Sequence, residues 1–199
     1  MRIIGVVDEN YMVAEFLKAE IDSSRFGDAI TQVLHMHNLT DNYIRNPNLE
    51  SETENRIRKL ILGSTRGYNN DRALFLGFPK EVQWKTVELE ADDLGRVIYA
   101  KHETWDKLTN GTRRLKDGAK NLINEKKIAG TDQILSISAD YSLGKKYPDL
   151  ILLNDSENNR LVLVEGHSRA TAYALNYKIK TPIRAIIGFS KNAKDWHWY

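Results

Sequence analysis

The chain contains no cysteine among its 199 residues. This absence excludes disulfide bonds, zinc sites built from thiolates and catalysis by a thiol. A chain without cysteine fits a reducing compartment, so we expect a cytoplasmic location.

Long hydrophobic runs are absent as well. The apolar run from Ile3 to Val7 is too short for a signal peptide, and the acidic residues Asp8 and Glu9 follow it at once. No stretch approaches the roughly 20 apolar residues that a membrane-spanning helix needs. The sequence therefore predicts no membrane partner.

The chain also has little net charge. Its formal value of +2 gives no argument by itself for a nucleic-acid partner. Hydrophobic residues make up 41% of the chain and charged residues 28%, which is an ordinary balance for a globular protein. The length allows one large domain, or a core domain with an appended lobe.

The N-terminal part carries helix signals. Val13, Phe16 and Leu17 share one helical face, and Ser51 with Glu54 has the spacing of a capping box. We therefore expect residues 1–79 to form a helical lobe with a connecting loop, and residues 80–199 to form the core domain.

The expected connection runs from Gly63 to Pro79 and contains Arg66 and Arg72. It lacks the Gly-Lys-Ser/Thr end of a P-loop, so it is not a Walker motif. One of its arginines can reach a phosphate from the lobe side. The alternative is that the segment is a simple connection.

The main organising feature of the chain is a pair of apolar runs, Leu150 to Leu153 and Leu161 to Val164, separated by a turn-prone loop at residues 154–159. Runs of this length around such a loop predict a β-hairpin. The second run is followed by a polar pentapeptide, residues 165–169. A helical run at residues 170–177 and a strand beginning near Thr181 complete this region.

The pentapeptide predicts a strand-to-helix turn. Gly166 allows a sharp backbone turn, and Ser168 is a suitable N-cap for the following helix. The free N–H groups of the helix start, with Arg169 beside them, suit an anion such as phosphate. The alternative is a plain turn whose Arg169 pairs with a surface carboxylate.

This arrangement of strand, Glu165–Arg169 turn, helix and a strand led by Pro182 resembles the ParB/sulfiredoxin superfamily. The resemblance covers about the last half of the chain. It implies an α+β fold with a mixed sheet and flanking helices, here carrying the N-terminal helical lobe. It also implies that nucleotide phosphates bind at the Gly-x-x-Arg turn.

Branches of the superfamily differ in what they need from this turn. Sulfiredoxins need a cysteine where this chain has His167, so their reductase chemistry is excluded. Partition proteins carry a DNA-reading helix-turn-helix after the turn, and the segment from Arg169 to Tyr199 is too short for one. A nucleic acid is therefore the less favoured partner.

The remaining branch comprises free serine kinases, whose motifs are a His-Glu pair and an Asp-Gly-His-His-Arg turn. This chain is similar in having His102-Glu103 and the turn Glu165-Gly166-His167-Ser168-Arg169. It departs from the pattern in Glu165, where the family has Asp, and in Ser168, where it has the second His. Because Ser168 replaces the second His, the substrate and metal contacts of that His do not carry over to this chain.

Phosphoryl transfer needs a phosphate cradle, a cation and a residue that orients or deprotonates the nucleophile. Residues 165–169 offer the cradle, and Glu165 can hold Mg²⁺ directly or through water. Glu103 is the expected base, with His102 or His167 contacting phosphate or substrate. Arg113 can clamp a second phosphate. Alternatively, Glu103 only stabilises a helix start, and Arg113 is a surface arginine.

Two functions follow. The first is a magnesium-dependent phosphotransferase or nucleotide hydrolase that uses ATP, ADP or another nucleotide and acts on a small hydroxyl substrate. The second is a non-catalytic, nucleotide-switched regulatory or nucleic-acid-associated binding module. Either function is compatible with a homo-oligomer. The first function predicts that Val97 to Ala100 form a strand in the same sheet as Leu161 to Val164. His102-Glu103 and the turn at residues 165–169 would then meet at one edge of this sheet.

The chain ends in the aromatic sequence Trp196-His197-Trp198-Tyr199. Two tryptophans and a tyrosine are costly to expose to water. We therefore expect this end to fold back on the core. The alternative is a partner surface or a platform on which bases stack.

Overall fold

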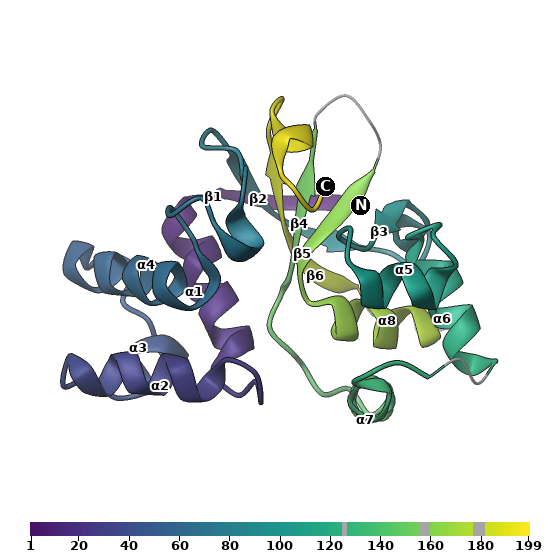
Figure 1. Cartoon of the computed structure of the whole chain (residues 1–199), viewed down its shortest axis with the longest axis horizontal. Coiled ribbons are helices and arrows are strands. Elements are labelled where there is room, and N and C mark those ends of the chain that lie inside the picture. The colour runs from purple at the N-terminus through teal and green to yellow at the C-terminus, as the bar shows by residue number, and fades with distance from the viewer. Residues whose placement is uncertain (125–126, 156–159, 177–181) are drawn as a thin grey trace.

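The computed structural model describes residues 1–124, 127–155, 160–176 and 182–199. A six-stranded mixed sheet lies between a group of helices from the N-terminal part and a second group from the C-terminal part (Figure 1). This confirms the α+β class. The expected positions of Tyr177, Thr181 and the loop at 156–159 lie outside the described residues.

The sheet has the strand order β1-β2-β6-β4-β5-β3. Its strands are β1 (Arg2–Val7), β2 (Gln83–Leu89), β3 (Val97–Ile98), β4 (Leu150–Asn154), β5 (Leu161–Glu165) and β6 (Ile183–Phe189). The β4 and β5 strands pair antiparallel, which confirms the expected hairpin. The pairs β3–β5 and β4–β6 are parallel.

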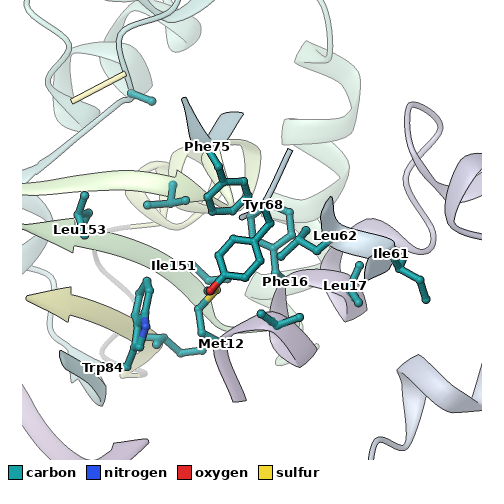
Figure 2. Close-up of a cluster of buried hydrophobic side chains, with 14 of the residues drawn as sticks. Met12, Phe16, Leu17, Ile61, Leu62, Tyr68, Phe75, Trp84, Ile151 and Leu153 are labelled. Atoms are coloured by element: carbon teal, nitrogen blue, oxygen red, sulfur yellow. The ribbon is translucent and has the colours of Figure 1, made fainter. Parts of the chain in front are cut away.

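The helices of the lobe pack on one face of this sheet. They are α1 (Glu9–Glu20), α2 (Gly27–Met36), α3 (Asn42–Arg45) and α4 (Glu52–Arg66). Figure 2 shows Phe16 of α1 and Leu62 of α4 in a single apolar cluster with Trp84, Ile151 and Leu153 of the sheet. The lobe and the core domain therefore share one hydrophobic core.

The later helices belong to the opposite side. They are α5 (Glu103–Thr109), α6 (Leu115–Ile123), α7 (Thr131–Ser142) and α8 (His167–Leu175), with short 3-10 turns at Ala73–Phe75, Asp93–Arg96 and Ala193–Asp195. Along β4, Ile151 and Leu153 face the lobe while Leu150 and Leu152 pack with α8 residues. Side chains alternate between the two faces of a strand, and both sets are buried because helices pack on both faces of the sheet.

Two boundaries differ from the expectation. The β1 strand, which the predicted boundary after residue 79 assigns to the lobe, pairs with β2 in the sheet. The α4 helix continues through Gly63 to Arg66, so the connection is shorter than expected. Gly67 ends α4 because it adopts a left-handed backbone, with φ of 87°, which glycine tolerates best.

The aromatic C-terminus folds back on the protein, as expected. Trp196 is buried, and its Nε1 donates to the carbonyl of Leu74 at 2.6 Å. The Nε1 of the half-buried Trp198 donates to the carbonyl of Ala73 at 2.9 Å. The last residues therefore tie the connecting segment to the sheet.

No helix in the described part of the chain combines the length and the apolar character needed to cross a bilayer.

Candidate phosphate-binding site

The strand-to-helix turn lies where the β5 strand ends at Glu165 and α8 begins at His167. Gly166 is the N-cap residue, with a left-handed φ of 95°. The expected capping role of Ser168 is wrong, because the helix has already begun one residue earlier. A side chain inside the first helical turn does not occupy the capping position.

No side chain among the described residues caps the start of α8. Its first main-chain hydrogen bond runs from the N–H of Ala170 to the carbonyl of Gly166, at 2.8 Å. The N–H groups of His167, Ser168 and Arg169 therefore have no acceptor among the described residues. Free N–H groups at the positive end of a helix form an anion-binding site.

Gly166 also leaves the space that Arg169 occupies. A Cβ atom at this position would lie 2.5 Å from Cδ2 of Leu150 and 3.0 Å from an Nη atom of Arg169. The turn therefore requires glycine both for its backbone angle and for its close packing.

Arg169 is buried and forms an ion pair with Glu165. Its expected alternative partner was a surface carboxylate, but Glu165 belongs to the same turn and its side chain is only 14% exposed. The Nε atom of Arg169 is buried and has no hydrogen-bond partner in the part of the chain that the structure describes. One donor of this buried guanidinium thus remains available to a ligand.

The ring of His167 stacks on Trp105 at 5.2 Å, and Trp105 stacks on Tyr99 at 4.7 Å. The Nε2 atom of His167 is buried, and none of the described residues forms a hydrogen bond with it. Burial, with the charge of Arg66 as the next cause, lowers the pKa of His167 to about 3. His167 is therefore neutral near pH 7, so it can exchange a hydrogen bond with a ligand but adds no positive charge.

Charged residues of the lobe act electrostatically on the same turn. Glu20, at the end of α1, is buried; its Oε1 lies 3.7 Å from Nε of Arg66, and its Oε2 has no hydrogen-bond partner among the described residues. Burial and then the charge of Glu165 raise the pKa of Glu20. The charges of Arg66 and Arg25 act on His167 as well. Charges of the lobe therefore influence the ionisation of groups in the turn.

The His102-Glu103 pair lies at the expected edge of the sheet. The β3 strand runs parallel to β5, with Val97 opposite Leu161 and Ile98 opposite Val162. The carboxyl ends of both strands therefore lie at the same edge of the sheet. This confirms the expected placement of the strands. His102 caps α5 by accepting from the N–H of Thr104 at 3.2 Å.

Glu103 itself is fully exposed at the start of α5 and pairs with Lys107. The hydrogen bond from Lys107 lowers the pKa of Glu103. Within the described residues, no contact joins Glu103 to Glu165 or Arg169. A surface hollow lined by His102, Glu103 and Trp198 opens beside it.

Arg113 does not point its donors at the turn. Its Nε donates to the carbonyl of Tyr99 at 2.9 Å, and its two Nη atoms donate to main-chain oxygens of Tyr199 and Trp198 at 2.9 and 3.3 Å. This arginine therefore holds the C-terminal segment, and its guanidinium is engaged by main-chain acceptors.

The oxygen donors near the turn suit Mg²⁺ only in part. Glu165 and Glu20 interact electrostatically, but Glu165 already pairs with Arg169. The described residues contain no group of three or more acidic or histidine side chains that could hold a metal. Mg²⁺ commonly binds through one or two carboxylates together with substrate phosphates and water. Glu165 fits that arrangement if the ion arrives with a phosphate ligand.

Sequence reasoning missed Glu20 and the stack of Tyr99 with Trp105. Glu20 follows Phe16 and Leu17 by four and three positions, so it shares their buried helical face. This spacing was a usable signal for a buried carboxylate. The stacking of this pair with His167 had no local signal, because His167 lies far from both aromatic residues in the chain.

The chain was compared with models of protein families, with curated proteins and with solved structures, and nothing matches it.

Proposed function

We propose that this protein binds a nucleotide through its phosphate groups at the start of α8. The observation that carries the proposal is the set of free N–H groups of His167, Ser168 and Arg169 beside a buried arginine. Buried donors are normally satisfied, so an unpaired Nε on Arg169 favours a ligand that brings acceptors. A phosphate brings several acceptor oxygens and the charge that a helix start prefers.

The ParB/sulfiredoxin-like core is part of this proposal. It is supported by the strand that ends at Glu165, the left-handed Gly166 and the helix that follows. In the superfamily that the sequence resembles, the corresponding turn binds nucleotide phosphates. The turn is proposed to contact the phosphates, so it does not specify the base. ATP and ADP are therefore the first of several nucleotides to test.

The catalytic form of the proposal is a magnesium-dependent phosphotransferase or nucleotide hydrolase that acts on a small hydroxyl substrate. It is supported by the parallel β3–β5 pair, which brings His102-Glu103 to the edge where the turn lies. Bound Mg²⁺ would offset phosphate charge during transfer. Arg169 and the helix start would hold the phosphate, while Glu103 would accept a proton from the hydroxyl group.

In this catalytic form, Glu103→Gln keeps nucleotide affinity but lowers turnover by about 100-fold, the usual size of a general-base effect. Phosphate release and transfer are measured with Mg²⁺, testing hydroxy amino acids as acceptors first. Lys107→Gln is the matched control, because it removes the partner of Glu103 while keeping the carboxylate. Equal turnover in Glu103→Gln and wild type would remove Glu103 as the base.

The second candidate is a non-catalytic, nucleotide-switched regulatory or nucleic-acid-associated module. It is supported by the exposed position of Glu103 and its pairing with Lys107, since a carboxylate with a lowered pKa is a weak base. In this case the protein binds nucleotide and releases no phosphate.

A thermal-shift panel of nucleotides with Mg²⁺ tests the binding that both candidates share. A ligand at about 100 times its Kd raises the melting temperature by about 5–10 °C for a chain of this size. Inorganic phosphate and the free nucleoside are the controls, because the proposed ligand is a nucleotide that binds through its phosphate groups. The free nucleoside lacks the phosphates, and inorganic phosphate lacks the nucleoside. No shift with any nucleotide or with phosphate would contradict the proposal.

A further inference from the structure

The sheet ends in two edge strands, and the one at β3 is protected. The β3 strand has only two residues, and Ile98 makes a further bridge to Arg114 on the side away from the sheet. Val97 is fully buried. Short length and a covering segment are two ways in which proteins keep a sheet edge from pairing with another chain.

The edge at β1 lacks both protections. This strand has six residues and, within the described part of the chain, it pairs only with β2 and receives no main-chain hydrogen bond from another segment on its outer side. Three of its apolar side chains are exposed: Ile3 by 54%, Ile4 by 51% and Val6 by 70%. Single exposed apolar residues are common, but these three lie along main-chain groups that are free to pair with another strand.

The sequence of β1 is complementary to itself about Gly5. If two copies of the strand pair antiparallel about a two-fold axis at Gly5, Ile4 lies opposite Val6, and Arg2 lies opposite Asp8. Directly opposite residues have Cβ atoms about 4.5–5.5 Å apart, so the exposed apolar side chains cover each other and opposite charges meet at both ends.

The contacts that these residues make in their own chain are compatible with this pairing. Arg2 forms an ion pair with Glu88, and its side chain is still 73% exposed. Asp8 is exposed and caps α1, but a carboxylate can accept several hydrogen bonds. The register of β1 against β2 shifts between Ile3 and Gly5, beside the two-fold axis, so both copies deviate there in the same way.

We propose that the protein forms a two-fold symmetric homodimer in which the β1 strands of two copies pair antiparallel about Gly5. The sheets of the two copies then form one continuous sheet. The occupant of the edge is a second copy because the charges at the two ends of this strand complement each other only in such a self-pairing. One short strand from each copy makes a small interface, so the association is weak. This inference is independent of the proposed phosphate binding.

Sedimentation equilibrium over a wide range of protein concentrations tests the dimer. Wild type changes from monomer to dimer as the concentration rises. Val6→Lys raises the dimer Kd by about tenfold or more, because a lysine on an edge strand opposes pairing and would lie against Ile4 of the other copy. Leu143→Lys is the matched control and keeps the wild-type Kd, because Leu143 is an 85% exposed apolar residue directly after α7.

Asp8→Asn tests the charge pairing, because asparagine can still cap α1 but carries no charge. It is expected to raise the dimer Kd by about two- to tenfold, the effect of losing two exposed ion pairs.

The absence of cysteine from the chain allows the pairing register to be measured directly. A Cβ atom at Gly5 would lie 3.7 Å from Oγ1 of Thr86, an ordinary contact, so Gly5→Cys should fold. On the two-fold axis the two cysteines have Cα atoms about 4.5–5.5 Å apart, which suits a disulfide bond. Oxidised glutathione should therefore link Gly5→Cys into a covalent dimer, and Val6→Cys much more slowly.

Three results would overturn the proposal. The first is a wild-type protein that stays monomeric at every concentration. The second is an unchanged dimer Kd in folded Val6→Lys, or an equal loss of dimer in Leu143→Lys. The third is cross-linking of Val6→Cys that is as fast as that of Gly5→Cys, which would contradict pairing about Gly5.

Discussion

At the scale of single residues, Gly166 meets a backbone requirement and a packing requirement together. Its φ is 95°, and a Cβ would lie 2.5 Å from Leu150. Gly144 has a similar φ of 85° with nothing within 4 Å of the added Cβ. Alanine substitutions at the two glycines therefore separate the free-energy cost of the backbone angle from that of steric crowding.

We expect Gly144→Ala to lower the unfolding free energy by about 1–2 kcal/mol, the cost of a left-handed backbone for an ordinary residue. Gly166→Ala should lower it by about 1–3 kcal/mol more, because the added methyl overpacks the turn. Urea unfolding of both variants measures the difference. Equal losses would contradict the close packing of Leu150 and Arg169 around Gly166.

The raised pKa of Glu20 predicts that its contribution to stability depends on pH. Burial and the charge of Glu165 raise its pKa in the folded protein above the ordinary value of 4.5, although Arg66, Arg25 and Arg169 oppose the shift. The folded state then holds the proton more tightly than the unfolded state. The ionised carboxylate therefore costs stability, and this cost grows as the pH rises above about 4.5.

We expect Glu20→Gln to be more stable than wild type at pH 7–8, with the advantage shrinking as the pH falls towards about 4. Unfolding curves of both proteins across this range measure it, since other titrating groups largely cancel in the comparison. Glu52→Gln, an exposed change on α4, is the control. A stability difference independent of pH would contradict a raised pKa for Glu20.

At the scale of elements, local patterns predicted most helices and the central hairpin. The spacing of Val13, Phe16 and Leu17 was sufficient to predict α1, although burial in this helix is not confined to one face, since every residue from Met12 to Leu17 is buried. The end of α4 was wrong because Gly63 looked like a helix breaker. The glycine is tolerated inside the helix, where a Cβ would lie 2.9 Å from the carbonyl of Tyr68.

The C-terminal aromatic segment is an element whose role can be measured. Trp196 is 2% exposed and hydrogen-bonded to Leu74, so Trp196→Ala should cost about 3–5 kcal/mol of unfolding free energy. Trp198→Ala is the matched control and should cost clearly less, because Trp198 is only half-buried. Unchanged stability in Trp196→Ala, with loss of a nucleic-acid or protein partner, would make this segment a binding surface instead.

At the scale of the whole molecule, the sequence could not predict which faces of the sheet the lobe and the later helices cover. Pairing of β1 with β2 joins residues about 80 positions apart, and no local pattern specifies such a contact. The same limit applies to the site. Residues 165–169 were predictable from their own turn chemistry, whereas Glu20 and Arg25 interact electrostatically with residues of the turn only because of how the lobe packs.

The central claim is that Arg169 and the start of α8 bind nucleotide phosphate. Isothermal titration of ATP and ADP with Mg²⁺ into wild type, Arg169→Ala and the control Arg56→Ala tests it most directly. A charged phosphate contact contributes about 1.5–3 kcal/mol, so Arg169→Ala should weaken binding by about 10- to 100-fold or more. Melting curves first establish that the variant is folded, since Arg169 also pairs with Glu165. Arg56→Ala should bind as wild type does, and wild-type affinity in a folded Arg169→Ala would contradict the phosphate site.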